Sequence, residues 1–560
     1  MARSGAGAGL ADDRTGHDRT GHGRTGHDRT GHDRTGTYCG NRRVVLSRSS
    51  LKQQLGARLW VLSDLTRADN RGRSSFRASA FRRAVWSLDS LSSDLREPPG
   101  RLLATPGIGP AIAGLTREFL LTGELAEVER LRGLYPREAV RMASLPRLTS
   151  RRLRVLKHDL GVEHLADLLT VIRGGQVAAI PGVGPATAAL WEQVLSGRPD
   201  MTSRPIHEAT CLLSRVQAHL RLHVPGYQAE AAGAVRRLDE WVPALDLEVT
   251  GDPTPVERFL SQSAITPGPV LAHGSKVEVP IHESIPLLVG RSTPGEGGGE
   301  PGGRGRERLS AGRVGAAARL VGFADVRGDL HLHSDWSPDG HQTLEGLVEA
   351  CSTRGYSYLA ITDHAIGLRF GGLDAAALAR QLIELEKLRK QHTEVGILHS
   401  AELNIARDGS LDYGEEALDA LDLGLAAVHS FFGLGEEEQT NRVIRAIEHP
   451  RVKVIGHLTG RRIGIRPPIS LDLEQVMAAA ARTGTALEVN GHLDRLDLSL
   501  SLVRRALANG VLLAANSDAH RLGELENIGN AISVIRRAGA GPEQVVNTWP
   551  VDRFTEWARR

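Results

Sequence analysis

The segment "DLHLHSDWSPDG" (Asp329–Gly340) decides how the second half of the chain folds. His331 and His333 stand one residue apart at the end of an apolar run, and Asp339 follows with a glycine directly after it. An isolated histidine at a strand end is more often a structural residue with a satisfied hydrogen bond than a metal ligand. Whether this segment binds metal therefore depends on how the neighbouring strands end.

From residue 327 onward, short apolar segments alternate with helical ones, which predicts βα units that form a (β/α)7 barrel. The seven strand candidates are "GDLHLH", "YSYLAITDH", "VGILHSAEL", "LGLAAVHS", "VKVIGHL", "TALEVNG" and "VLLAANSDAH". In such a barrel, active-site residues lie at the C-terminal ends of the strands. Most of these strands end in side chains of metal-ligand type, namely His331, His333, Asp339, His364, Glu402, His429, His457, Asp518 and His520.

Nine such side chains at one end of a barrel need compensating positive charge. Without metal, the carboxylates would repel one another and the imidazoles would lack partners. Imidazole and carboxylate ligands without thiolate suit Zn, Mn or Fe, and nine ligands exceed one tetrahedral site and suit two or three ions. A cluster of this kind favours phosphoester hydrolysis, because the ions activate water and neutralise the charge of the transition state.

The motifs resemble, in the same order, those of the PHP (polymerase and histidinol phosphatase) family: HxH, TDH, a lone Glu, VHS, a His before TGR, and DAH. The resemblance covers about residues 326 to 557. It implies a distorted seven-stranded barrel that holds a trinuclear metal site, with the nine residues above as ligands. It also implies a metal-dependent phosphoesterase.

The first motif departs from the family pattern, since Pro338 interrupts the usual Ser-Asp-Gly. Asp339 is still the preferred ligand because Gly340 follows it, and Asp335 is a second candidate. Arg461 in "HLTGR" is a candidate contact for a substrate phosphate, and the alternative is an arginine held in a salt bridge at the surface.

Residues 51 to 199 have a helical pattern with two similar segments, "TPGIGPAIAGL" and "IPGVGPATAAL". Each is typical of a helix-hairpin-helix, in which glycines allow a tight turn and leave amides free at a helix N-terminus. We expect Gly107, Gly109, Gly182 and Gly184 to bind DNA phosphates without reading sequence. An ordinary helical hairpin is the alternative, but arginine is concentrated in this half, which favours a polyanionic partner.

The same half resembles the N-terminal part of bacterial family X DNA polymerases, which carry a PHP domain at the C-terminus. "FRASAFRRA" and the two hairpin segments match in order, and the resemblance runs from about residue 51 to 290. Pro110 replaces the lysine that is common after the first glycine turn, which removes one possible phosphate contact.

Residues 200 to 292 are predicted to form a small α+β unit that corresponds to the polymerase palm. Nucleotidyl transfer in this family needs three carboxylates for two Mg ions. Here the turn "GAVRR" has Ala234 in place of serine, and Ala244 takes the first position of the expected Asp-x-Asp pair. Asp246 remains as a catalytic candidate, and Glu248 on the same strand face is a partial substitute. The expected third aspartate and the thumb are missing, so we expect polymerase activity to be lost; Mg would be needed only by an active palm.

The rest of the chain is predicted to connect or precede these domains. A tail over residues 1 to 50 contains RTGH repeats and is expected to be disordered, and residues 293 to 314 form a Gly/Pro/Arg linker before the barrel of residues 315 to 560. Cys39, Cys211 and Cys351 are far apart, and no apolar run is of signal-peptide or membrane-spanning type. A cytoplasmic protein is expected, with no membrane partner.

The favoured function is a DNA-directed, metal-dependent phosphoesterase, as a 3′-5′ exonuclease or in 3′-end processing during repair. An active family X repair polymerase with an attached exonuclease, and a small-molecule phosphatase of the histidinol-phosphate type, are the alternatives. A non-catalytic DNA-binding scaffold is disfavoured by the complete ligand set.

Overall fold

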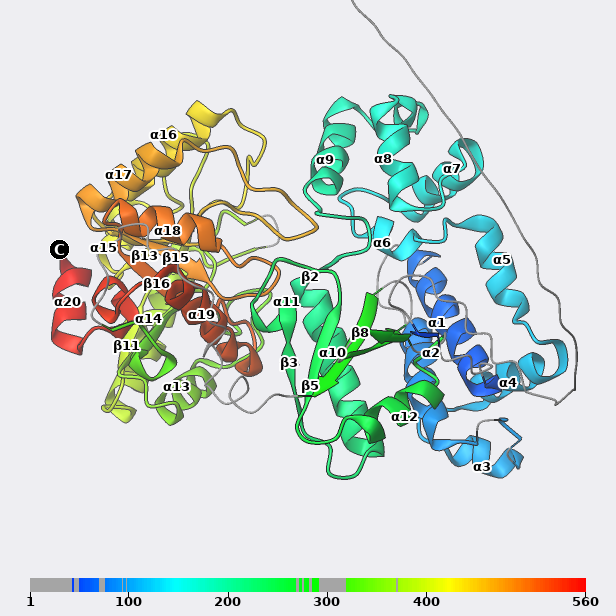
Figure 1. Ribbon diagram of the computed structural model, residues 1–560. Helices are drawn as coiled ribbons and strands as arrows, with labels where there is room; N and C mark the ends of the chain where they lie inside the picture. The colour runs from blue at the N-terminus through cyan, green and yellow to red at the C-terminus, as the bar shows by residue number, and fades with distance from the viewer. Residues whose placement is uncertain are drawn as a thin grey trace, which may run out of the picture.

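A computed structural model of the chain describes residues 43–44, 50–69, 76–92, 94–96, 98–267, 271–273, 276–281, 285–291, 319–368 and 371–560. The RTGH repeats and the predicted linker over residues 293 to 314 lie outside the described residues. Along the described chain, a helical region, a palm-like sheet and a C-terminal barrel follow one another (Figure 1).

The helical region confirms both predicted hairpins. Its helices are α1 (Leu51–Asp69), α2 (Phe76–Ser87), α3 (Pro99–Ala104), α4 (Pro110–Thr122), α5 (Ala126–Leu134), α6 (Ala139–Ala143), α7 (Ser150–Leu160), α8 (Leu165–Arg173) and α9 (Pro185–Ser196). Helices α4 and α9 each begin at a proline, whose missing N–H costs nothing at the first helical position. In the turns before them, Gly107 and Gly182 have φ of 87° and 78°, which favours glycine.

The palm is a sheet of order β1-β6-β7-β8-β5-β3. Its strands are β1 (Arg43–Val44), β3 (Ala229–Ala232), β5 (Leu245–Val249), β6 (Leu271–His273), β7 (Lys276–Ile281) and β8 (Ile285–Arg291). A second pair, β2 (Arg204–Pro205) and β4 (Trp241–Val242), lies beside it with the helices α10 (Ile206–His223), α11 (Gly233–Arg236) and α12 (Thr254–Gln262). One hydrophobic core runs from Leu55 in α1 to Val289 in β8, so the helical region and the palm pack as one body.

The barrel consists of parallel strands that alternate with helices. The strands are β9 (Gly328–Leu332), β10 (Tyr358–Ile361), β11 (Gly396–His399), β12 (Glu402–Asn404), β13 (Gly424–Ala427), β14 (Val452–Ile455), β15 (Ala486–Asn490) and β16 (Leu513–Asn516). The helices are α13 (Leu344–Thr353), α14 (Ala375–Gln391), α15 (Glu415–Asp419), α16 (Glu436–Ile447), α17 (Leu473–Thr483), α18 (Leu500–Ala508), α19 (Ile528–Ala538) and α20 (Val551–Arg559). Most of these strands are buried along their whole length, as strands covered on both faces must be.

The ring of strands is distorted. The strands form two sheets, β11-β10-β9 and β12-β13-β14-β15-β16. Single bridges join Leu332 at the end of β9 to Ala519 after β16, and His364 after the central strand β10 to Glu402 at the start of β12. The segment "VGILHSAEL", predicted as one strand, is two, because β11 pairs with β10 whereas β12 pairs with β13. This break lets Glu402 start a new strand beside the end of β10.

Candidate metal centre

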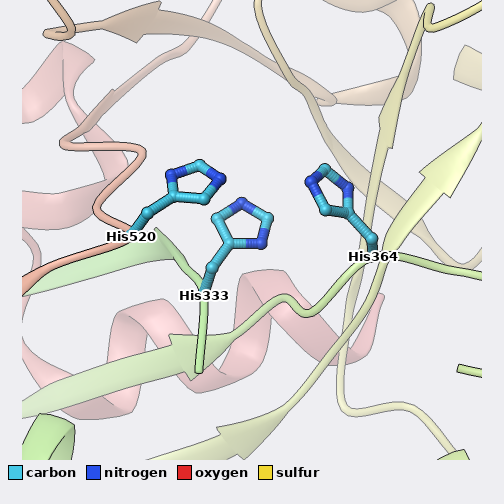
Figure 2. Close-up of side chains that lie close together, drawn as sticks. All are labelled: His333, His364 and His520. Atoms are coloured by element: carbon cyan, nitrogen blue, oxygen red, sulfur yellow. The ribbon is translucent and has the colours of Figure 1, made fainter. Parts of the chain in front are cut away.

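The strand ends bring all nine predicted ligands to one end of the barrel. Ligand atoms lie within 4.8 Å of one another in four overlapping groups. The groups are His333, His364 and His520; His331, His457 and Asp518; His331, His333 and Glu402; and His364, Glu402 and His429. Figure 2 shows the imidazoles of the first group facing one another from three different strand ends. Asp339 joins that group, with its Oδ2 3.5 Å from the Nε2 atoms of both His364 and His520.

Glu402 lies at the middle of the cluster, almost fully buried. Its Oε1 accepts a hydrogen bond from the ring of His457 at 2.9 Å. The Nδ1 atom of His364 lies 2.7 Å from Oε2, and the Nε2 atom of His429 lies 3.0 Å from Oε1, but neither ring nitrogen has a hydrogen-bond partner. Ring nitrogens and carboxylate oxygens that lie this close without a well-formed hydrogen bond are arranged as the ligands of a common ion are.

Several other donor atoms of the cluster are buried without a partner. They include Nε2 of His331, Nε2 of His333 and Oδ1 of Asp339. An unpaired buried polar atom costs roughly 1–3 kcal/mol, so a group of them at one place needs an explanation. Divalent cations with a preference for nitrogen and oxygen ligands fit this donor set.

Mutual contacts perturb the protonation of the cluster. Burial alone would raise the pKa of Glu402, but the imidazoles of His429, His364 and His331 hold that pKa well below its usual range. The pKa of His333 is lowered by burial first and then by the charges of His520 and His364. Burial opposes the charged form of His331, His364 and His520 as well, but neighbouring carboxylates raise the pKa of all three rings. Metal binding requires the deprotonated carboxylate and the neutral imidazole, so a bound cation would replace the protons of these rings.

An outer layer of hydrogen bonds fixes the rings. The Nδ1 atom of His331 lies 2.7 Å from Oε1 of Glu488, and the Nδ1 atom of His429 lies 2.7 Å from Oδ1 of Asn404. Glu488 is fully buried and also accepts hydrogen bonds from Asn516 at 2.9 Å and from the backbone N–H of His457 at 2.6 Å. Glu488 was not among the residues predicted from the sequence. A lone carboxylate inside the apolar segment "ALEVN" indicates a buried polar role and could have identified it.

Comparison with known proteins agrees with this geometry. Residues 58–125 match the helix-hairpin-helix domain, and residues 329–500 match the PHP domain. The "DNA polymerase/3'-5' exonuclease PolX" of Bacillus subtilis is 27% identical over 538 residues, which cover 85% of this chain and 94% of the relative. A "Probable phosphatase" of Syntrophotalea carbinolica is 31% identical over 231 residues, which cover 39% of this chain and 90% of the relative. The chain belongs to the PHP family.

Its PHP barrel is that of a metal-dependent phosphoesterase, and the match to PolX spans the helical region, the palm and the barrel, as in bacterial family X DNA polymerases. A solved histidinol phosphate phosphatase from Lactococcus lactis aligns with a TM-score of 0.30 and 19% identity, over 38% of this chain and 94% of that chain. The family assignment rests on the sequence relatives. None of the helices that the structure describes has the length and hydropathy of a membrane-spanning segment.

The PHP barrel keeps its first motif in spite of Pro338. The chain turns back so that Oδ2 of Asp339 lies 3.5 Å from the Nε2 atoms of His364 and His520, whereas Asp335 is exposed. The turn requires glycine after Asp339, because a Cβ on Gly340 would lie 1.8 Å from the carbonyl oxygen of Ser334.

Arg461 is not brought to the PHP cluster. Its Nη1 donates to Oε1 of Glu240 in the palm at 2.8 Å, and its Nε and Nη2 donate to the carbonyls of Arg495 and Leu496 at 2.9 and 2.5 Å. The arginine thus ties the palm to a barrel loop. Arg495, which the sequence analysis did not single out, reaches the cluster instead, with Nε 3.2 Å from Oδ2 of Asp518 and a buried Nη1 without a partner.

In the palm next to the PHP barrel, the two carboxylates that remain in β5 both have basic partners. Nζ of Lys276 in β7 lies 2.8 Å from Oδ1 of Asp246, and Nη1 of Arg236 lies 3.8 Å from Oε2 of Glu248. Both remaining carboxylates of β5 are therefore neutralised by basic side chains, and Ala244 offers no ligand.

The four hairpin glycines of the helical region, Gly107, Gly109, Gly182 and Gly184, are exposed at the turns before α4 and α9. Gly109 and Gly184 occupy the N-cap positions of these helices, so the amides of the first helical turn face solvent near them. In the second turn, Nη2 of Arg152 donates to the carbonyl of Gly182 at 2.7 Å and adds positive charge.

Proposed function

We propose that this protein is a metal-dependent nuclease that removes nucleotides from the 3′ ends of DNA or cleans such ends during repair. The observation that carries the proposal is the convergence of unpartnered buried donors on Glu402, in a chain that also has a helix-hairpin-helix domain. The PolX relative, named as a polymerase and 3'-5' exonuclease, supports this choice of reaction.

The donor set fits three divalent ions of the Mn, Zn or Fe type. One would be held by His333, His364 and His520 with Asp339, one by His331, His457 and Asp518, and one by His429 with Glu402. Glu402 belongs to two of the four groups, so its carboxylate would bridge ions. Bound ions of this kind supply activated water and offset the charge that develops on a phosphodiester.

The chain's own residues orient the substrate and the ligands. The unpartnered Nη1 of Arg495, next to Asp518, is available to donate to a nonbridging phosphate oxygen at the edge of the cluster. Glu488 keeps the His331 ring in one orientation and one tautomer, with Nε2 facing the cluster. The hairpin turns at Gly107 and Gly182 would bind DNA through backbone amides without sequence preference.

We further propose that the palm no longer polymerises DNA. Two-metal transfer needs several carboxylates free to bind Mg, but Ala244 provides none and Asp246 is paired with Lys276. An active repair polymerase is favoured only by the name of the PolX relative. A small-molecule phosphatase is favoured by the name of the Syntrophotalea relative, but such an enzyme has no need of a helix-hairpin-helix domain.

The test is digestion of a 5′-labelled, recessed DNA strand by the purified full chain with Mn²⁺. The proposal predicts a ladder of progressively shorter products, and none with the double variant His331→Ala/His333→Ala. Hydrolysis of a small phosphomonoester without any shortening of DNA would assign the PHP site to a phosphatase instead. Shortening that survives the double variant would place the nuclease elsewhere.

A further inference from the structure

A basic groove lies between the helical region and the palm, apart from both hairpins. It consists of two adjoining cavities of about 560 and 460 Å³, which share Arg67, Arg82 and Arg215. The walls are α1 and α2 on one side and α10 on the other, and α6 borders the second cavity; Figure 1 shows α10 beside α1 and α2. We refer to it as the α10 groove.

The charge of the α10 groove is strongly one-sided. Its lining arginines are Arg67, Arg82, Arg83, Arg141, Arg204 and Arg215, whereas its lining carboxylates are Asp64 and Glu208. Asp64 is already paired with Arg82, and Glu208 with Arg204. The first cavity has no carboxylate in its lining. Arg141 is paired with Glu138 outside the lining, and Arg82 also packs over the ring of Trp60. The groove therefore carries an excess of guanidinium groups over carboxylates, to which Arg67, Arg83 and Arg215 contribute most.

Arg67 and Arg215 face each other across the α10 groove from α1 and α10, and no described carboxylate forms an ion pair with either. Burial, and then the nearby charge of Arg82, lowers the pKa of Arg67; Asp64 and Glu208 partly oppose this, and Arg215 adds to it. Like charges held together in a partly desolvated groove are unfavourable until an anion joins them. Guanidinium groups are suited to phosphate, which they bind in a planar, bidentate manner.

The shape of the α10 groove favours a strand over a single phosphate. Its lining side chains run along α10 from His207 to Leu222, a helical stretch of about 23 Å. Trp86 lies in the wall of the first cavity, and Leu222 is 81% exposed at one end. Trp60 in the wall of the second cavity is buried, with Arg82 packed over its ring. Sites for single-stranded nucleic acid combine such a charged track with aromatic surfaces and begin at about four nucleotides.

We propose that the α10 groove binds single-stranded DNA through its phosphates, with Arg67 and Arg215 as central contacts. The site differs from the hairpin turns, which offer backbone amides rather than a track of side chains. It extends the proposed function by adding a path for an unpaired strand, and it does not depend on catalysis, so binding can be measured while hydrolysis is blocked.

The experiment is fluorescence anisotropy of a labelled short oligothymidylate with the full chain in excess chelator, which prevents hydrolysis. The variant Arg67→Gln/Arg215→Gln should weaken binding at least about tenfold, since each lost contact is a hydrogen bond between charged groups. The slope of log K against log salt should fall in magnitude by about 1.4, which corresponds to two phosphate contacts on a single strand. Replacing both residues with lysine should keep the slope.

The matched control is Arg482→Gln/Arg505→Gln. It removes the same charge from exposed arginines on α17 and α18, which pair with Glu448 and Glu474 on the outside of the barrel. A melting temperature equal to that of the wild type shows that the groove variant folds. Such a value is expected, because removing Arg67 also relieves its repulsion with Arg82 and Arg215. The proposal is overturned if the groove variant and the control bind the oligothymidylate alike. It is equally overturned if blunt duplex DNA loses as much affinity as the single strand.

Discussion

The PHP cluster and the palm both hold carboxylates on β-strands or directly beside them, and they neutralise those carboxylates in different ways. In the PHP cluster, Glu402 accepts a hydrogen bond from His457, while the nearby ring nitrogens of His364 and His429 are buried without a hydrogen-bond partner. In the palm, Asp246 has a direct ion pair with Lys276, and Glu248 faces Arg236.

The difference teaches how a metal site is recognised without its metal. Where the chain itself supplies the countercharge, as in the palm, a divalent ion would have to displace a lysine. Where buried donors are left unpaired, as in the PHP cluster, the chain depends on something from outside to stabilise them. The two regions therefore differ in whether their buried ligand atoms lack partners, and not in how many acidic residues they contain.

The largest effect is expected from removing PHP ligands. The variant His331→Ala/His333→Ala should lower DNA hydrolysis by more than the roughly 10–100-fold typical of losing an outer partner, because two ions lose a direct ligand. Bound metal, measured by inductively coupled plasma mass spectrometry, should fall with it. Full metal content with full activity in this variant would show that His331 and His333 are not the ligands on which hydrolysis depends.

The outer hydrogen bonds should have the next largest effect. Glu488→Gln keeps the shape of the side chain but removes the charge that orients His331. We expect a loss of roughly 10–100-fold in hydrolysis or in metal affinity. Titration of the metal-free variant with Mn²⁺, followed by activity, measures both. A variant that is indistinguishable from the wild type would mean that the Glu488 contact is only structural.

A smaller effect is expected where the palm meets the barrel. Arg461→Ala breaks the ion pair to Glu240 and frees the loop that carries Arg495. Misplacement of a substrate contact should lower kcat/KM for DNA by about tenfold while metal content stays unchanged. Glu240→Gln, which leaves the two loop hydrogen bonds of Arg461 in place, should cost less. Loss of metal in either variant would contradict a purely positioning role.

The smallest effect is expected in the palm itself. Asp246→Ala removes the last carboxylate of the ancestral pair, but this side chain is occupied by Lys276. Hydrolysis of DNA and bound metal should both stay within about twofold of the wild type, as for a surface ion pair away from the site. A clear fall in bound Mg²⁺ or Mn²⁺ would show that the palm still holds an ion. It would contradict the claim that Lys276 alone neutralises Asp246.

Much of the PHP cluster follows from the sequence because parallel strands present their C-terminal ends together. That rule brought His364, His429 and His457 to one place from segments far apart in the chain, whereas Glu402 lies at the start of β12. The two hairpins were equally accessible, since a glycine turn before a proline is a local signal that needs no tertiary information.

Other features depended on tertiary contacts that no local pattern contains. The break between β11 and β12 arises because the two halves of one apolar run pair with different neighbours. Arg461 and Arg495 lie near each other in the same barrel rim, and only the docking of Glu240 decides which of them faces away from the cluster. The pairing of Asp246 with Lys276 likewise joins two strands that are distant in sequence.

The central claim is that the PHP site hydrolyses DNA and the palm does not polymerise it. The most direct test is primer extension on a gapped template, with a 5′-labelled primer, Mn²⁺ and all four nucleotides. The wild type, His331→Ala/His333→Ala and Asp246→Ala are compared side by side. The account predicts shortening by the wild type and Asp246→Ala, no change with the histidine variant, and no extension by any of them. Extension by the histidine variant that Asp246→Ala abolishes would show that the palm still polymerises, and would contradict the account.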